Sequence, residues 1–209
     1  MTVTSPNSTR IVLVHGLFMG RHAMRYLEKQ LAAAGFDVEC FAYNTVTGNL
    51  ESAASRLAQV LNSDTRPVAL VGHSLGGLVA LKAAQLCVAA PLSAVVLLGS
   101  PYQGAAAARV LRKLTGGKRS RIGRALTDWA LLKSKPLAPA PVFTLSGTRS
   151  LGLGRIVCGF KEPNDGTVSV AETYYPGATS AIHPVSHTGM LFSTPVANQV
   201  KAWLLASAK

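Results

Sequence analysis

The stretch VGHSLGG (Val71–Gly77) places a serine between glycines, with an apolar run on either side. A Gly-X-Ser-X-Gly pentapeptide that follows a strand and precedes a helix forms a very tight turn, in which only small residues fit beside the serine. The turn exposes the serine side chain at the edge of the sheet, and the free amides of the helix N-terminus point toward it. Because both flanks have the required patterns, we predict that Ser74 is a nucleophile and not a turn or cap serine.

Strand and helix patterns alternate on both sides of this turn. Short apolar or alternating runs, typical of strands, occupy 10–16, 36–43, 67–72, 93–100 and 141–147, with a weaker one near 178–183. Apolar residues at helical spacing occupy 20–34, 50–62, 75–89 and about 194–206. The alternation predicts an α/β fold with a mostly parallel sheet and helices on both faces. In such sheets, functional groups gather outside the carboxyl ends of the strands.

Residues 67–99 are nearly all apolar, with Lys82 as their only charge, and could be mistaken for a membrane span. Glycines and Pro91 interrupt the segment, and its β-branched residues lie at its two ends. We therefore predict strand, turn, helix and strand here, and no transmembrane segment.

The positive charge of the chain is concentrated in one segment. The net charge is +12, and residues 105–135 contribute +8 of it, from nine Lys/Arg and one Asp. This segment carries two short amphipathic pieces and interrupts the alternation, so it is a candidate helical cap inserted into a single domain that spans 1–209. It could contact anionic lipid weakly, or it could be a solvated face that keeps the protein soluble. With no basic groove rich in aromatics and no known module, we expect no nucleic-acid partner.

Three cysteines, Cys40, Cys87 and Cys158, are far apart, odd in number and surrounded by apolar residues. The pattern predicts buried free thiols in a reducing compartment. Since the N-terminus lacks a basic segment followed by an apolar one, we expect no secretory signal and a cytoplasmic protein.

A serine nucleophile needs a histidine base, which follows it in the chain in this architecture. Only His183 and His187 come late enough. His183 precedes Pro184 and is expected to end the last strand, whereas His187 lies in the loop before the terminal helix. We therefore predict that His187 is the base.

The base needs a carboxylate to orient it, between the nucleophile and the histidine in sequence. Within this interval, the loop after the strand at 141–147 offers Glu162 and Asp165, and Glu172 lies further on. Asp165 lies in a turn, NDG, which can hold a carboxylate toward a histidine, although turn aspartates are common without such a role. We predict that Asp165 is the acid.

Two backbone amides would stabilise the oxyanion. One belongs to Leu75, directly after the nucleophile, and the other to Leu17, in the loop after the first strand. Phe18 and Met19 follow in that loop and are expected to line the acyl pocket.

The motifs VHGLF, GHSLGG, GSPYQG, NDGTVSV and SHTGM resemble, in this order, those of the α/β-hydrolase fold superfamily, in its lipase/esterase branch. The resemblance spans the chain from about Arg10 to the terminal helix. It implies a Ser74–Asp165–His187 triad that acts on an ester without a cofactor. The loop GSPYQG resembles the Gly-Thr-Pro-His-X-Gly loop that shapes the pocket of true lipases, with Tyr102 as one departure, so Tyr102 is a further candidate pocket residue. Some members bind calcium near the histidine, but the chain has nine acidic residues and no acidic cluster, so we expect no metal.

The function that follows from these residues is hydrolysis of a small-molecule ester or a lipid through an acyl-enzyme. A thioesterase or an acyltransferase would use the same triad. A third alternative is an inactive hydrolase-fold protein that binds lipid or a partner. Acyl-chain preference and oligomeric state stay open, because fold does not fix substrate.

Overall fold

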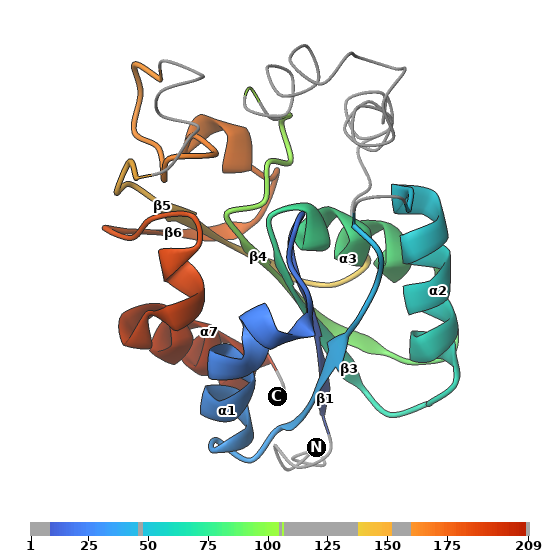
Figure 1. Cartoon of the computed structure of the whole chain (residues 1–209). Helices are drawn as coiled ribbons and strands as arrows, with labels where there is room; N and C mark the ends of the chain where they lie inside the picture. The colour runs from blue at the N-terminus through green and yellow to red at the C-terminus, as the bar shows by residue number, and fades with distance from the viewer. Residues whose placement is uncertain (1–8, 46–47, 105, 107–137, 152–159, 208–209) are drawn as a thin grey trace.

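Six parallel strands form one sheet in the computed structural model, which describes residues 9–45, 48–104, 106, 138–151 and 160–207. The order across the sheet is β2-β1-β3-β4-β5-β6 (Figure 1). The strands are β1 (Arg10–Val14), β2 (Asp37–Phe41), β3 (Val68–His73), β4 (Leu92–Leu98), β5 (Val142–Gly147) and β6 (Thr179–His183). The mostly parallel sheet that the alternating pattern predicts is confirmed.

Helices cover both faces of this sheet. Helices α2 (Leu50–Asn62) and α3 (Leu75–Leu86) pack on one face, and α1 (Arg25–Ala32) and α7 (Thr194–Ser207) pack on the other (Figure 1). Short 3₁₀ helices, η2 (Arg21–Met24), η4 (Ala171–Thr173) and η5 (Gly189–Phe192), lie in the connections. The predicted helices are therefore confirmed, with the first one divided into η2 and α1.

The sheet separates the core into two layers because side chains alternate along each strand. In β1, Val12 and Val14 pack toward α2 and α3, whereas Ile11 and Leu13 pack toward α1 and α7. All five residues of β1 are buried, as expected of a parallel strand covered on both faces. The edge strand β2 is only half-buried, which fits the alternating sequence from which the strand was predicted.

Residues 67–99 form β3, α3 and β4, which confirms the prediction of strand, turn, helix and strand. Across the described part of the chain, no helix combines the length and the apolar character that a membrane span requires. Most of the candidate cap, 105–135, lies outside the described residues.

The prediction of buried thiols is wrong for two of the cysteines. Cys40 and Cys87 are free but only half-buried, because Cys40 lies on the edge strand β2 and Cys87 directly follows α3. Cys158 lies outside the described residues.

The sheet order reverses between β1 and β3. The chain passes from β1 to its neighbour β2 at the edge, and then returns to the other side of β1 as β3. In open parallel sheets, ligands bind outside the carboxyl ends of the strands at such a reversal. The segments that follow β1 and β3, which contain Leu17 and Ser74, meet at this place.

Candidate active site

The turn between β3 and α3 holds Ser74 in an unusual backbone conformation. Its φ is 53° and its ψ is −123°, a combination that non-glycine residues rarely adopt. The amide of Ser74 donates to the carbonyl of Leu98 at the end of β4, at 2.9 Å. Such conformations persist where the surroundings enforce them, which is common at functional sites.

Close backbone contacts on both sides explain the two glycines of the pentapeptide. A Cβ atom on Gly72 would collide with the backbone of Gly77. A Cβ atom on Gly76 would collide with the carbonyl oxygens of Val14 and His15. The turn is therefore locked between β1 and the start of α3, and Ser74 is carried at the carboxyl edge of the sheet.

Asp165 and His187 form a buried hydrogen-bonded pair. The Nδ1 atom of His187 lies 2.7 Å from Oδ2 of Asp165. Asp165 is 1% exposed and His187 is 7% exposed. Shielding from solvent strengthens the electrostatic part of such a contact. The structure thus brings together two of the residues that the sequence singled out.

The NDG turn fixes the carboxylate of Asp165. Its second oxygen, Oδ1, accepts the amides of Thr167 at 2.9 Å and Val168 at 2.7 Å. Gly166, with a φ of 95°, provides the left-handed residue that this turn requires. Both carboxylate oxygens therefore accept hydrogen bonds, Oδ1 from the amides of the turn and Oδ2 from the imidazole of His187.

The side chain of Ser74 is half-buried and has no hydrogen-bond partner among the described residues. The structure therefore does not contain a serine–histidine bond. Catalytic hydrogen bonds are often long or unformed without substrate, and they tighten in the complex. The ring of His73, the residue before Ser74, packs against the ring of His187 with centroids 4.7 Å apart.

Gly99 packs against the acid and the base, a contact that the sequence pattern does not indicate. A Cβ atom at this position would lie 3.2 Å from both Asp165 Oδ2 and His187 Nδ1, and the φ of Gly99 is 56°. The glycine that opens the GSPYQG loop was the available signal, but nothing in the sequence indicated that it packs on the acid and the base.

The amides of Leu17 and Leu75 lie just beyond the carboxyl ends of β1 and β3. Within the described ranges, neither the amide of Leu17 nor that of Leu75 makes a hydrogen bond. The adjacent amide of Phe18 donates to Thr45 Oγ1 at 3.1 Å, and Phe18 has a φ of 58°. A bulky residue with positive φ is strained, so the contact with Thr45 helps to hold this loop in place.

The candidate pocket residues fall into different environments. Phe18 is 56% exposed, and Met19 is partly buried against the α1 and α7 layer. Tyr102, in contrast, is 2% exposed, and its ring packs on Tyr175 with centroids 4.6 Å apart. Tyr102 thus belongs to the core under the loop, because the turn that follows Gly99 directs its ring inward.

The alternative acids and bases have other contacts. Glu172 accepts the amides of Ala106 and Ser169 and thereby holds two loops together. Glu162 is exposed at the surface. His183 ends β6 and hydrogen-bonds Gln199 of α7.

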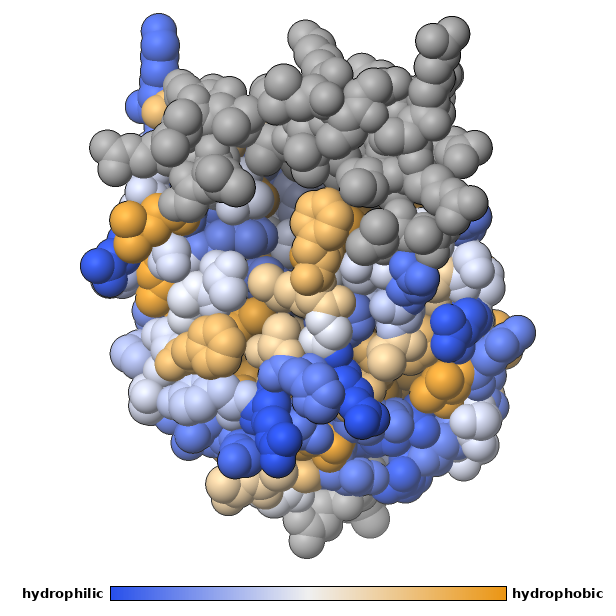
Figure 2. All heavy atoms as spheres, in the orientation of Figure 1, coloured by the Kyte–Doolittle hydropathy of each residue, from blue (hydrophilic) through white to orange (hydrophobic). Residues whose placement is uncertain are grey.

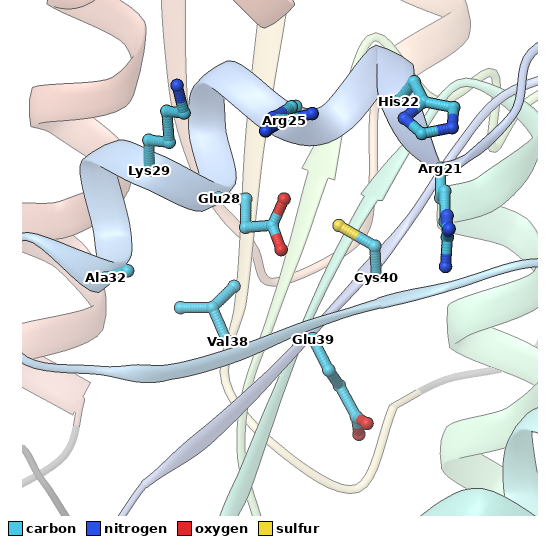
Figure 3. A pocket seen from close by; sticks show the side chains of 9 residues that line it. All are labelled: Arg21, His22, Arg25, Glu28, Lys29, Ala32, Val38, Glu39 and Cys40. Carbon is cyan, nitrogen blue, oxygen red and sulfur yellow. The ribbon is translucent and has the colours of Figure 1, made fainter.

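A separate hollow of about 600 Å³ lies between α1 and the edge strand β2. Figure 3 shows Glu28 and Cys40 pointing toward each other across it, with Arg21, Arg25 and Lys29 around the rim. Burial, together with Glu28, raises the pKa of the Cys40 thiol to about 12. The thiol is therefore protonated at neutral pH, which disfavours a nucleophilic role.

Apolar and hydrophilic residues are interspersed on the face shown in Figure 2. The large apolar side chains that are exposed in the described ranges are Phe18, Leu86, Val88, Leu151, Tyr174, Ile182, Phe192 and Leu205. Phe18 is the one among them that lies in the loop beside the serine turn.

Comparisons with known proteins agree with this fold. The model of the alpha/beta hydrolase family matches residues 11–203. A search of curated proteins finds no match.

Solved structures with the same fold include lipases. The mature form of the Bacillus licheniformis lipase BlEst2 superposes with a TM-score of 0.74 at 20% identity, over 96% of this chain and 93% of that one. A monoacylglycerol lipase from Paleococcus ferrophilus gives 0.65 at 18% identity, over 97% and 96% of the two chains. A lipase-esterase related protein from Clostridium acetobutylicum gives 0.62 at 14% identity, over 96% of each chain. At these identities, the similarity establishes the fold.

Proposed function

The chain belongs to the alpha/beta hydrolase family, and from this premise we propose that it is a serine hydrolase that cleaves carboxylic esters. The observation that carries the proposal is the buried hydrogen bond between Asp165 and His187, at 2.7 Å, beside the strained turn of Ser74. A nucleophile, an acid and a base in this order along the chain, Ser74, Asp165 and His187, are the arrangement that serine hydrolases of this fold use for acyl transfer.

In the proposed reaction, Nε2 of His187 takes the proton of Ser74 as Oγ attacks the ester carbonyl. Asp165 accepts a hydrogen bond from Nδ1–H of His187, so it keeps Nε2 unprotonated before the attack and stabilises the imidazolium afterwards. The imidazolium then protonates the departing alcohol, which leaves an acyl-enzyme on Ser74. Water, activated by His187, attacks the acyl group and releases the acid.

The amides of Leu17 and Leu75 are the proposed donors to the oxyanion that forms in both steps. Their supporting feature is that both amides are unpartnered, within the described residues, next to the serine turn. Leu75 is also the first residue of α3, so the positive end of the helix dipole faces the developing charge. The loss of one such donor typically costs about 10²- to 10³-fold in kcat.

We propose esters or lipids as the substrate class. The support is that the solved neighbours include a lipase and a monoacylglycerol lipase. We propose that Phe18 and Met19, which follow the proposed oxyanion residue Leu17, contact the acyl chain. Because Cys40 and Cys87 are unpaired thiols, we also propose the reducing cytoplasm as the compartment.

Reaction with a fluorophosphonate probe tests the proposal. The full chain should gain one phosphonyl group on Ser74, detected by peptide mass spectrometry, and the Ser74→Ala variant should gain none. An inactive hydrolase-fold protein would not react. Hydrolysis of soluble esters of graded acyl length, with matched thioesters in parallel, would then define the substrate range.

A further inference from the structure

Three of the four polar groups of His187 have a hydrogen-bond partner. The amide donates to the carbonyl of Asp165 at 2.9 Å, and Nδ1 contacts Oδ2 of the same residue at 2.7 Å. The carbonyl oxygen of His187 lies 2.9 Å from Nε2 of His73. The fourth group, Nε2 of His187, has no partner among the residues described. The backbone of His187 is thus held on both sides of its Cα, and the nitrogen that would transfer the proton is left free.

His73 is the residue directly before Ser74 and the last residue of β3. Its side chain is fully buried, and its ring lies against that of His187 at an angle of 47°. On the other side, Gly16 packs so closely that a Cβ atom there would lie 2.9 Å from Nδ1 of His73. The ring is therefore confined between the loop that follows β1 and the loop that carries His187.

The protonation state of His73 follows from its partner. A carbonyl oxygen can only accept, so Nε2 of His73 must carry the proton in this contact. Burial lowers the pKa of His73 to about 3, so the ring is neutral at neutral pH. A neutral donor holds the carbonyl of His187 without placing a second positive charge beside the imidazolium that forms during the reaction.

The hydrogen bond joins parts of the fold that are far apart in the chain and in the sheet. His73 and His187 are separated by 114 positions. Ser74 follows β3, whereas His187 follows β6, and β4 and β5 lie between these strands. The placement of the nucleophile relative to the base would otherwise depend on the packing of four strands and their loops.

We propose that His73 is a positioning residue, which sets the placement of His187 relative to Ser74 through the hydrogen bond from its Nε2 to the carbonyl of His187. The inference rests on the proposed serine hydrolase function, in which His187 is the base for Ser74. Its role is distinct from packing, because the required property is a donor at the position of Nε2 and not the volume of the ring.

Three substitutions separate the donor from the volume. His73→Leu keeps the approximate volume and removes the donor. His73→Gln keeps a donor at the ε position, and His73→Asn carries the same amide one carbon shorter. We expect kcat to fall roughly 10- to 100-fold in His73→Leu and His73→Asn, as misplacement of a catalytic group by about 1 Å does. In His73→Gln, most of the activity should return, and KM should change by less than about threefold in all three.

A matched control is Asn62→Leu. The side chain of Asn62 also bonds the backbone of a distant loop, through Leu86 O, Val88 N and Ala89 N, but at the opposite end of the sheet. This variant should lose stability toward urea and keep its kcat. Equal losses of kcat in Asn62→Leu and His73→Leu, or equal kcat in His73→Gln and His73→Asn, would overturn the proposal.

A spectroscopic measurement keeps the proposal testable without turnover. The proton between His187 Nδ1 and Asp165 should give a low-field ¹H resonance, whose position and sharpness would report the geometry of that pair. It should persist in His73→Gln and shift or broaden in His73→Asn.

The two proposals can fail separately. If the wild-type chain failed to react with the fluorophosphonate, the proposed function would be refuted. An unchanged resonance in His73→Asn would refute the role of His73 alone. If His73→Leu does not fold, the comparison of Gln with Asn decides.

Discussion

His187 forms two hydrogen bonds with Asp165. Its ring Nδ1 contacts the carboxylate Oδ2 at 2.7 Å, and its backbone amide donates to the backbone carbonyl at 2.9 Å. Two bonds to one residue fix the tilt of the imidazole relative to its own chain. Since Asp165 is itself held by the amides of its turn, the orientation of the ring is determined by local backbone structure. The expected effects of substituting Asp165, His187 or Ser74 follow from this hydrogen-bonded arrangement.

Ser74→Ala should abolish ester hydrolysis and leave the fold intact. It removes the proposed nucleophile, and triad losses of this kind lower kcat on the order of 10⁴- to 10⁶-fold. His187→Ala should reduce kcat to a similar residual level, because nucleophile and base act as a unit. Initial rates on a soluble ester, with circular dichroism as the test of folding, measure both. His183→Ala, which removes the contact with Gln199, serves as the histidine control, and a greater loss there would mean that the base is misassigned.

Asp165→Asn should lower kcat about 10⁴-fold with little change in KM. The amides of Thr167 and Val168 hold Oδ1, so the new amide nitrogen would face Nδ1 of His187. Nδ1 would then have to accept, and Nε2 would carry the proton and be unable to take one from Ser74. Steady-state kinetics check this outcome. Glu162→Gln is the matched control at an exposed acid, and a comparable loss in Glu162→Gln or Glu172→Gln would place the acid elsewhere.

The strand and helix pattern was predictable because its physical cause is local. Parallel strands that are covered on both faces need continuous apolar runs, as in Arg10–Val14, and α2 has the bounds that its periodicity predicts. The tight turn was predictable as well, since the glycines at 72 and 76 leave room for neighbouring backbone. The sequence order of acid and base likewise pointed to Asp165 and His187.

Contacts between distant segments were not predictable. No periodicity indicates that His73 bonds the carbonyl of His187 or that Gly99 packs on the acid and the base. Tyr102 was expected at the pocket because the GSPYQG loop resembles a pocket-shaping loop of lipases, yet its ring packs on Tyr175 in the core. Side-chain direction within a loop depends on the turn geometry, and the residue types do not specify it.

Thr45→Val should lower kcat roughly 10-fold and leave KM nearly unchanged. Thr45 Oγ1 accepts the amide of Phe18, and this bond holds the loop in which the amide of Leu17 is the proposed oxyanion donor. Loss of a positioned donor costs more than this, about 10²- to 10³-fold, so partial loosening of the loop should cost less. Rates on a soluble ester check the size of the effect, and Thr45→Ser, which keeps the hydroxyl, should retain wild-type kcat. A Thr45→Ser variant as slow as Thr45→Val would argue against the hydrogen bond.

The free energy of unfolding should fall as the pH drops from about 6.5 toward 3, in part because of His73. Burial lowers the pKa of His73 to about 3, and the neighbouring rings of His187 and His15 act in the same direction. Between the two pKa values the unfolded chain binds the extra proton, so this contribution is complete above pH 6.5 and is lost toward acid, by at most about 1.4 kcal/mol per pH unit.

Urea unfolding between about pH 7.5 and pH 4.5 tests the sign. His73→Gln should show a shallower decline than the wild type. The decline should not vanish, since burial also lowers the pKa of His15. His22→Gln, at an exposed position of η2, should follow the wild-type curve. Parallel curves for wild type and His73→Gln would contradict the prediction.

Residues 105–135 should bind anionic vesicles if they form a lipid-contacting cap. They carry a net charge of +8 out of +12, interleaved with apolar residues at helical spacing, a combination that suits a membrane surface. Reversal of Arg112, Lys113, Arg119 and Arg121 to Glu should abolish the binding and leave hydrolysis of a short soluble ester unchanged.

Co-sedimentation with vesicles of anionic and of neutral lipid, over a range of salt concentrations, measures the binding. Binding should weaken as salt rises, because exposed charges more than about 8–10 Å apart are screened near physiological ionic strength. If the wild-type protein does not bind anionic vesicles at low salt, the lipid-contacting cap is refuted. The charges would then serve only to keep the protein soluble.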